Sequence, residues 1–176
     1  MVMGLFYENL DDVTRDYMVD ELKYDQKKGK IYISSRLTPE GEKEWVNLLK
    51  EALRNYNDDW LAQELKNRGY IRKREYTKKG NKSVPNNAYE TLAEGEFNRY
   101  YIRGVCRRAI DEGIEEVEVY RGKLVEDPRP ESQRKIGQRI KADILLEDLR
   151  ESVGKSPTLG IPQPNSGLTV RLLQKK

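Results

Sequence analysis

The stretch that predicts the fold spans residues 92–109 and has the sequence LAEGEFNRYYIRGVCRRA. Apolar or aromatic residues recur in it every four positions, the spacing that keeps side chains on one face of an α-helix. The resulting apolar seam consists of Ala93, Phe97, Tyr101, Val105 and Ala109. The pattern predicts a long central helix, from about residue 87 to residue 112, with the seam in the core.

Arginines recur beside the seam with the same spacing, at Arg99, Arg103 and Arg107. On a helix they would form one cationic edge, with Tyr100 next to it. Arginine binds phosphate and carboxylate groups in a bidentate manner, and tyrosine and arginine are enriched at protein interfaces. We therefore predict that this arginine row binds a protein partner or a nucleic-acid backbone. The alternative is pairing within the helix, for which Glu96 is well spaced.

The overall charge does not by itself predict a nucleic-acid partner. The 176-residue chain has 33 basic and 30 acidic residues, a net charge of +3. Charged residues make up 36% of the chain, well above the usual quarter, and hydrophobic residues only 36%. This composition is typical of a small core under a highly charged surface.

The basic residues are concentrated in one segment, residues 70–82. It contains Arg72, Lys73, Arg74, Lys78, Lys79 and Lys82 against the single acid Glu75. Tyr70 and Tyr76 are interleaved with them, the mixture of charge and aromatic rings that binds single-stranded nucleic acid. Two alternatives stay open: an arm that orders against an acidic protein surface, and an exposed basic loop without a role.

The lack of histidine excludes several classes of enzyme. The chain has no histidine and one cysteine, Cys106. A structural zinc site within one chain and the Ser-His-Asp or Cys-His catalytic arrangements are therefore excluded. A magnesium site would need converging carboxylates, for which the candidates are Glu94, Glu96, Glu116 and Glu118. We expect these to be ordinary surface acids, and we expect no enzyme activity, no metal and no cofactor.

The remaining patterns predict short helices and few strands. Helices are expected over 8–27, with Asn9 or Asp11 as the cap, from Thr38 through Leu53, and from Asn57 to Gly69. A short helix is expected after Pro130 and a last one from Asp143 to about 154. Strands are expected at 30–34, at 114–121 and at 168–172, the last two pairing with each other.

Together these elements predict an α+β fold. The N-terminal half is mainly helical, a long central helix follows, and a small β-sheet lies in the C-terminal half. The expected organisation is a helical lobe at 1–69, a basic linker or arm at 70–87, and a second lobe at 88–176. One compact domain overall is the alternative.

The compartment is inferred from cysteine usage and from hydropathy. A single cysteine inside a helical pattern indicates a reducing environment. No window approaches the roughly 20 apolar residues of a membrane span, and the apolar residues at the start are too few for a signal peptide. We expect a protein of the cytoplasm, or of a virion assembled there, with no membrane partner.

Four segments resemble a group of small uncharacterised bacterial and prophage proteins. They are TLAEGEFNRYYIR at 91–103, VYR at 119–121, PRPES at 128–132 and PNSGL at 164–168. The resemblance covers most of the chain and implies a role in a phage or mobile element. It implies no activity and no catalytic residue.

Two functions are therefore expected from the sequence. The first is a non-enzymatic structural or interaction protein associated with a phage or prophage, acting as a homo-oligomer or as part of a virion assembly. The second is a nucleic-acid-binding accessory protein that uses the basic arm and the arginine row on phosphates.

Overall fold

The computed structural model describes residues 4–174, which form six α-helices and five β-strands. The α+β fold is confirmed, with 49% of the chain in helices and two small antiparallel sheets. The helices are α1 (Asp12–Lys27), α2 (Pro39–Asn55), α3 (Asp58–Asn67), α4 (Ala88–Asp111), α5 (Pro130–Lys135) and α6 (Ala142–Glu151). The strands are β1 (Arg74–Thr77), β2 (Gly80–Ser83), β3 (Glu116–Arg121), β4 (Arg139–Lys141) and β5 (Leu168–Leu172).

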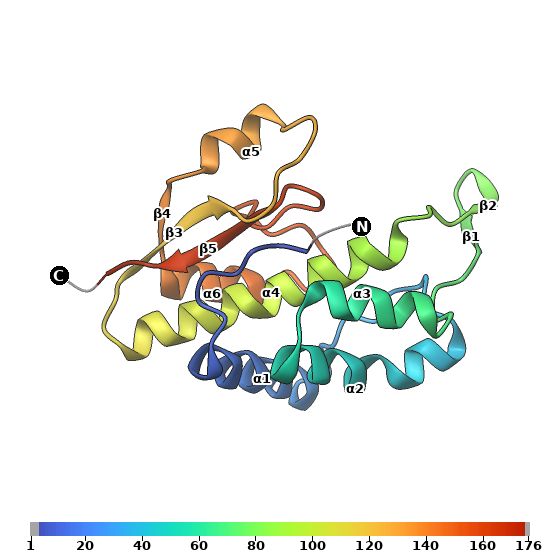
Figure 1. The fold of residues 1–176 in the computed structure, drawn as a ribbon, viewed down its shortest axis with the longest axis horizontal. Helices are drawn as coiled ribbons and strands as arrows, with labels where there is room; N and C mark the ends of the chain where they lie inside the picture. Colours follow the sequence, from blue (N-terminus) through green and yellow to red (C-terminus); the bar gives the residue numbers. More distant parts are fainter. Residues whose placement is uncertain (1–3, 175–176) are drawn as a thin grey trace.

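The 24-residue helix α4 is the centre of the molecule. Figure 1 shows it crossing the body, with α1, α2 and α3 on one side and the sheet of β3, β4 and β5 on the other. All five residues of the apolar seam are fully buried, as predicted. Cys106 is also buried, and its burial raises the thiol pKa well above the usual range.

Three predicted helix starts are confirmed by their capping hydrogen bonds. The side chain of Asp11 accepts from the backbone N–H of Thr14, and that of Thr38 accepts from Gly41. Asn57 caps α3 in the same way. Each cap satisfies an N–H group that has no partner inside the helix.

Helices α1 and α4 approach closely at Gly104. A Cβ atom at this position would lie 2.6 Å from Cγ of Met18 and 3.1 Å from the backbone oxygen of Thr14. Glycine is therefore required here by helix packing, although it lowers helix propensity by about 1 kcal/mol.

We expect Gly104→Ala to lower the free energy of unfolding by about 1–3 kcal/mol, because the added methyl forces α1 away from α4. Gly95→Ala on the same helix is the matched control, since nothing lies within 4 Å of its added Cβ. This control should be neutral or stabilising by up to about 1 kcal/mol. Urea denaturation measures the free energy of unfolding of both variants. Equal changes in Gly104→Ala and Gly95→Ala would contradict the packing argument.

The three-stranded sheet has the order β4-β3-β5, with β3 antiparallel to both neighbours. The predicted pairing of the two C-terminal strands is confirmed, with Val119 opposite Val170. Both valines are fully buried. Strand β4 was not predicted, because its three residues are mostly polar and pair with only half of β3.

Two local predictions are wrong. Residues 30–34 form no strand, and the carbonyl of Tyr32 instead accepts a hydrogen bond from the Trp45 indole at 3.0 Å. Asp143 lies inside the first turn of α6 rather than at its cap, which is Lys141. At 30–34 the backbone binds a side chain of α2 instead of a neighbouring strand. At α6 the helix follows directly after strand β4, so it begins before Asp143.

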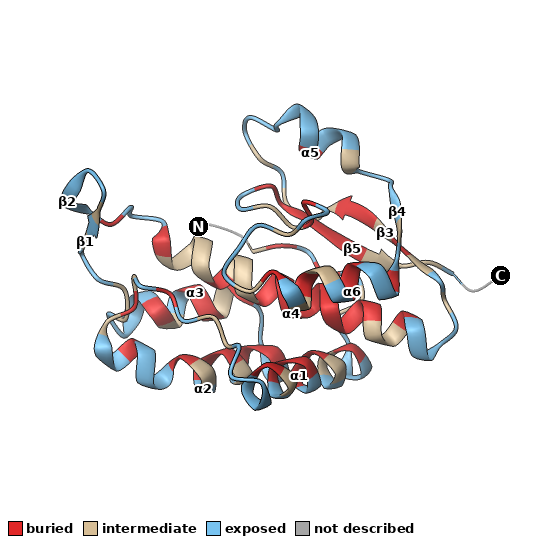
Figure 2. Cartoon of the chain, turned by 180° about the vertical axis from the view of Figure 1, so that it is seen from behind, coloured by how far each residue is buried: buried red, intermediate tan, exposed pale blue. Residues whose placement is uncertain are grey.

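One hydrophobic core extends across the predicted boundary at 70–87. Trp45 and Leu61 from the first predicted lobe belong to the same buried cluster as Phe97, Val119 and Leu149 from the second. Figure 2 shows the buried residues as one band through the middle of the molecule. Within residues 4–174 no helix is sufficiently long and apolar to cross a membrane.

Candidate functional site

The arginine row is not an exposed surface, which corrects the prediction for its central members. Arg103 is fully buried, Tyr100 is 3% exposed and Arg99 is 8% exposed. Only Arg107 keeps a partly exposed side chain. These side chains bind other parts of the same chain, so Arg99, Tyr100 and Arg103 are not available to a partner.

Arg103 lies at the centre of a buried ion-pair network between α4 and α1. Its Nε donates to Glu21 at 2.9 Å, and its two Nη atoms donate to the carboxylate of Asp25 at 2.7 and 2.8 Å. The hydroxyl of Tyr100 donates to the same carboxylate. Fully buried charges require such pairing, because an uncompensated charge in the core is very costly.

Glu21 accepts from three arginines that come from two helices. Besides Arg103, these are Arg107 at 2.9 Å and Arg150 at 2.7 Å. Burial disfavours the charged form of Glu21, but the hydrogen bonds and charges of Arg150, Arg103 and Arg107 outweigh it and lower its pKa. The network joins α1, α4 and α6 and is structural.

Arg99 completes the end of α6. Its Nη1 donates to the carbonyl of Ser152 at 3.0 Å, and its Nη2 donates to that of Leu149. Carbonyls at the end of a helix lack intrahelical partners and favour a positive charge. The sequence could not show this role, because the carbonyls lie 50 or more residues away along the chain.

The basic segment 70–87 forms a β-hairpin that projects from the body (Figure 1). Strands β1 and β2 pair in register from Arg74 opposite Ser83 to Thr77 opposite Gly80. Lys78 and Lys79 form the turn. The arm was predicted, but its strands were not, because its second half consists of turn-forming and basic residues.

The hairpin is anchored at its base and free at its tip. Arg72 donates to the carbonyl of Leu37, and Glu75 forms a bidentate pair with Arg36. Arg74 binds Asn81 across the hairpin. Arg72 and Arg74 are therefore partly committed to the fold.

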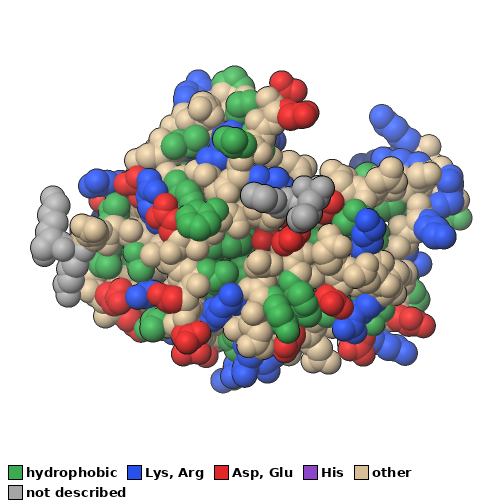
Figure 3. All heavy atoms as spheres, viewed as in Figure 1, with side chains coloured by type: hydrophobic (Ala, Val, Ile, Leu, Met, Phe, Trp, Pro, Cys, Tyr) green, Lys and Arg blue, Asp and Glu red, His purple; other side chains and the backbone are tan. Residues whose placement is uncertain are grey.

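Four lysines of the hairpin make no ion pair with any residue in the range 4–174, and all are exposed. They are Lys73, Lys78, Lys79 and Lys82. Tyr76 between them is 87% exposed, the most exposed aromatic ring of the described chain. The space-filling view shows basic side chains gathered on this projection (Figure 3). An exposed ring among free lysines is the arrangement that binds a phosphate backbone and stacks on a base.

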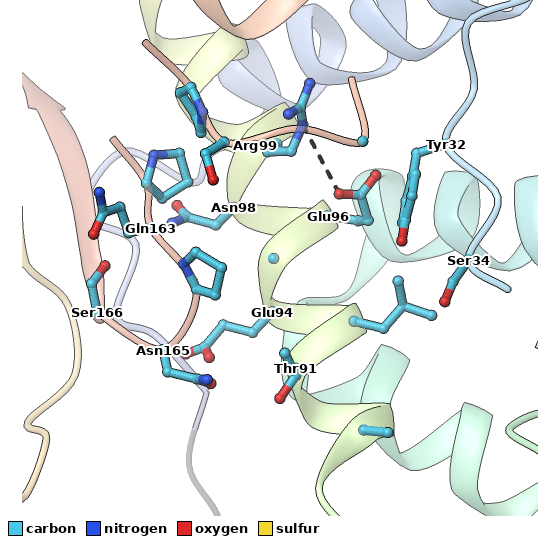
Figure 4. A pocket seen from close by; sticks show the side chains of 18 of the residues that line it. Tyr32, Ser34, Thr91, Glu94, Glu96, Asn98, Arg99, Gln163, Asn165 and Ser166 are labelled. Carbon is cyan, nitrogen blue, oxygen red and sulfur yellow. Dashed lines mark ion pairs between the residues drawn. The ribbon is translucent and has the colours of Figure 1, made fainter. Parts of the chain in front are cut away.

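A pocket of about 400 Å³ lies against the first half of α4, on the side of the C-terminal loop. Its size is ordinary for a small-molecule site. Figure 4 shows Glu94, Asn98 and Arg99 from α4 facing Gln163 and Asn165 of the loop, with Tyr32 and Ser34 on the opposite side. No sequence pattern predicts this pocket, because three segments distant in sequence form it.

Glu96 is the less compensated of the two carboxylates that line the pocket. Its carboxylate accepts no hydrogen bond from residues 4–174, and the nearest cation is Nε of Arg99 at 3.9 Å. Burial raises the pKa of Glu96 to about 7, an effect that Asp25 increases and that Arg99 and Arg103 only partly offset. A carboxyl group of this kind inside a cavity marks a candidate binding or proton-transfer site.

Glu94 and the amide nitrogen of Asn98, which also line the pocket, have partners within the chain. Lys123 donates to Glu94 at 3.2 Å. Asn98 donates through Nδ2 to the carbonyl of Leu168, while its Oδ1 is buried without a partner in the described chain. Burial also raises the pKa of Glu94, although Lys123 opposes the shift.

The four carboxylates considered as magnesium ligands do not form a metal site in the described chain. Glu94 pairs with Lys123, and Glu118 accepts from Arg171 at 2.8 Å. Within residues 4–174 no group of three or more potential ligands is arranged to hold a metal ion. Of these four, Glu96 is the one that lies in the pocket and accepts no hydrogen bond from the described chain.

The chain was compared with protein-family models, with curated proteins and with solved structures, and none of them matches. The resemblance to prophage proteins therefore stays a prediction. The function must be argued from the hairpin and the pocket themselves.

Proposed function

We propose that this protein is a non-enzymatic nucleic-acid-binding protein that contacts its partner through the β1–β2 hairpin. The observation that carries the proposal is the projecting hairpin, which bears four exposed lysines without ion pairs in the described chain and the 87% exposed Tyr76. The lysines attract phosphates and the ring offers a stacking surface, so single strands are the favoured partner.

The burial of Arg99 and Arg103 reduces the number of basic residues that can contact phosphates. Arg99 and Arg103 are used in the core, so the phosphate contacts fall to the hairpin alone. For single strands the logarithm of affinity changes with the logarithm of salt concentration by about −0.7 per phosphate contact. Four lysines then imply a slope of about −3.

The triple variant Lys78→Ala, Lys79→Ala, Lys82→Ala should bind single-stranded nucleic acid at least about tenfold more weakly, and its salt slope should be shallower by about 2. Fluorescence anisotropy with a labelled oligothymidylate and the corresponding RNA, in 50–200 mM salt, measures both quantities. The matched control changes three exposed lysines in α1 and the turn that follows it, namely Lys23, Lys27 and Lys30. It has the same net charge and should lose less than about twofold. Equal losses in both triples, or no binding by the unchanged protein, would refute the proposal.

Tyr76→Ala tests the stacking contact separately. We expect a loss of about 1–3 kcal/mol in binding to single strands, with the salt slope unchanged. Because Tyr76 is exposed, the free energy of unfolding should stay within about 0.5 kcal/mol. An unchanged affinity would show that the hairpin binds through charge alone.

The same hairpin supports a second candidate, an arm that docks on an acidic protein surface in a phage-associated assembly. The unpaired lysines and exposed strands of the hairpin favour it. Size-exclusion chromatography with light scattering at low and high salt separates the two candidates. A defined oligomer free of nucleic acid, lost in the hairpin triple variant, would favour the arm. Excess absorbance at 260 nm that disappears in high salt would favour nucleic acid.

A further inference from the structure

The central pocket is a second candidate site, separate from the hairpin, and it contains a carboxylate that forms a long ion pair but accepts no hydrogen bond from the described chain. Glu96 lies in the pocket with its side chain 12% exposed. Arg99 cannot approach it further, because both of its Nη atoms are held by the carbonyls of Ser152 and Leu149. The carboxylate therefore has no hydrogen-bond donor in the described chain.

The walls of the pocket fit an alkyl chain that ends in a cationic group. The ring of Tyr32 lies beside Glu96 (Figure 4), and the face of a tyrosine attracts ammonium and guanidinium groups. Prolines 157, 162 and 164 of the loop and Leu92 of α4 supply apolar contact. Ser34 adds a hydroxyl group at the same end.

Arg99 is the one cation of the described chain that forms an ion pair with Glu96, at 3.9 Å and without a hydrogen bond, and the other cations nearby are bound elsewhere or exposed. Arg103 is neutralised by Glu21 and Asp25, and Arg36 is neutralised by Glu75. Lys155 lines the pocket but is exposed to solvent. Arg99 is the one nearby guanidinium without a hydrogen-bonded carboxylate.

We propose that the central pocket binds a cationic N–H group on a short alkyl chain, an alkylguanidine or alkylamine, with the carboxylate of Glu96 as its ion-pair partner. Such a group supplies the hydrogen-bond donors that Glu96 lacks, and the apolar walls cover the chain. The group can come from a free small molecule or from an arginine or lysine side chain of a peptide.

The test is an NMR-detected titration with butylguanidine, with butanol and butyrate as neutral and anionic probes of similar size. We expect butylguanidine to bind at least about tenfold more tightly than either control. Glu96→Gln should abolish this preference, whereas Glu94→Gln should change affinity less than about threefold, because Lys123 already compensates Glu94. Equal binding of the three probes, no binding at all, or tighter binding of butyrate would overturn the proposal.

The pH dependence gives an independent readout. Butylguanidine keeps its charge at all relevant pH values, so its affinity should follow the ionisation of Glu96 and rise about tenfold from pH 6 to pH 8. Glu96→Gln should remove this rise. A rise that persists in Glu96→Gln would assign the effect to another group and overturn the role of Glu96.

The source of the group is resolved by a second probe, an acetylated and amidated Gly-Arg-Gly peptide. Tighter binding than that of butylguanidine would identify a protein side chain as the ligand. Equal or weaker binding would identify a free small molecule. The hairpin triple variant should behave as the unchanged protein in all of these titrations, so failure here is distinguishable from failure of the nucleic-acid proposal.

Discussion

Arg103→Met is expected to lower the free energy of unfolding by about 3–5 kcal/mol, a large part of the stability of a typical domain. The change leaves the carboxylate of Asp25 buried with only the Tyr100 hydroxyl as a side-chain donor. Glu21 keeps Arg107 and Arg150, so the loss is concentrated at Asp25. Urea denaturation followed by circular dichroism measures the effect.

Arg68→Met is the control for Arg103→Met. Arg68 pairs with Glu64 at 2.8 Å within α3, but its side chain is 48% exposed. Exposed pairs of this spacing contribute only about 0.3–0.5 kcal/mol. A loss below about 1 kcal/mol in Arg103→Met would show that the network does not stabilise the fold. If that variant fails to fold, Asp25→Asn, which keeps the shape of the side chain, replaces it.

Glu96→Gln is expected to raise the free energy of unfolding at pH 8 by about 1–3 kcal/mol. Burial raises the pKa of Glu96 from its ordinary 4.5 to about 7, which corresponds to an upper bound of about 3 kcal/mol. Between these two values the folded chain holds a proton that the unfolded chain has released. Rising pH therefore lowers stability across this window, and the full cost is present above pH 7.

The difference in free energy of unfolding between Glu96→Gln and the unchanged protein should vanish at low pH. Below pH 4.5 Glu96 is protonated in both the folded and unfolded states, so Glu96→Gln should match the unchanged protein within about 0.5 kcal/mol. Chemical denaturation at pH 4, 6 and 8 checks the trend. A destabilised variant at pH 8 would show that Arg99 depends on the Glu96 charge more than the geometry indicates.

Residues that lower the stability of the folded state are typical of functional sites. Glu96 fits this description, because an isosteric amide should be more stable in its place at neutral pH. The Arg103 network is the opposite case, in which every buried charge is paired. The pocket and the network share α4 and differ in whether the chain itself supplies hydrogen bonds to the buried carboxylate.

The local features of this chain follow from its sequence. The four-residue spacing of the seam predicts α4, and Asp11, Thr38 and Asn57 predict where three helices begin. The alternation in 117–121 and 168–172 predicts two strands that pair. These predictions succeed because capping and amphipathic periodicity act between residues close in sequence.

The tertiary structure determines which charged side chains of α4 are buried and which residues they pair with. A helix with polar groups on one side normally exposes them, but α4 is covered by α1, α3, α6 and the sheet. Arg103 is therefore buried, and its partners Glu21 and Asp25 lie about 80 residues earlier in the chain. No local pattern shows such a pairing.

The sequence by itself determined the helices, three of their caps, one pair of strands and a basic arm, because each depends largely on neighbouring residues. Only the tertiary structure decided which charges are compensated. It buried Arg99 and Arg103 of the arginine row, folded the arm into a hairpin with a free tip, and placed Glu96 in a pocket that a loop some 60 residues further along the chain also lines. The burial of a charged group and its pairing depend on every segment that packs around it, and the fold determines which segments these are.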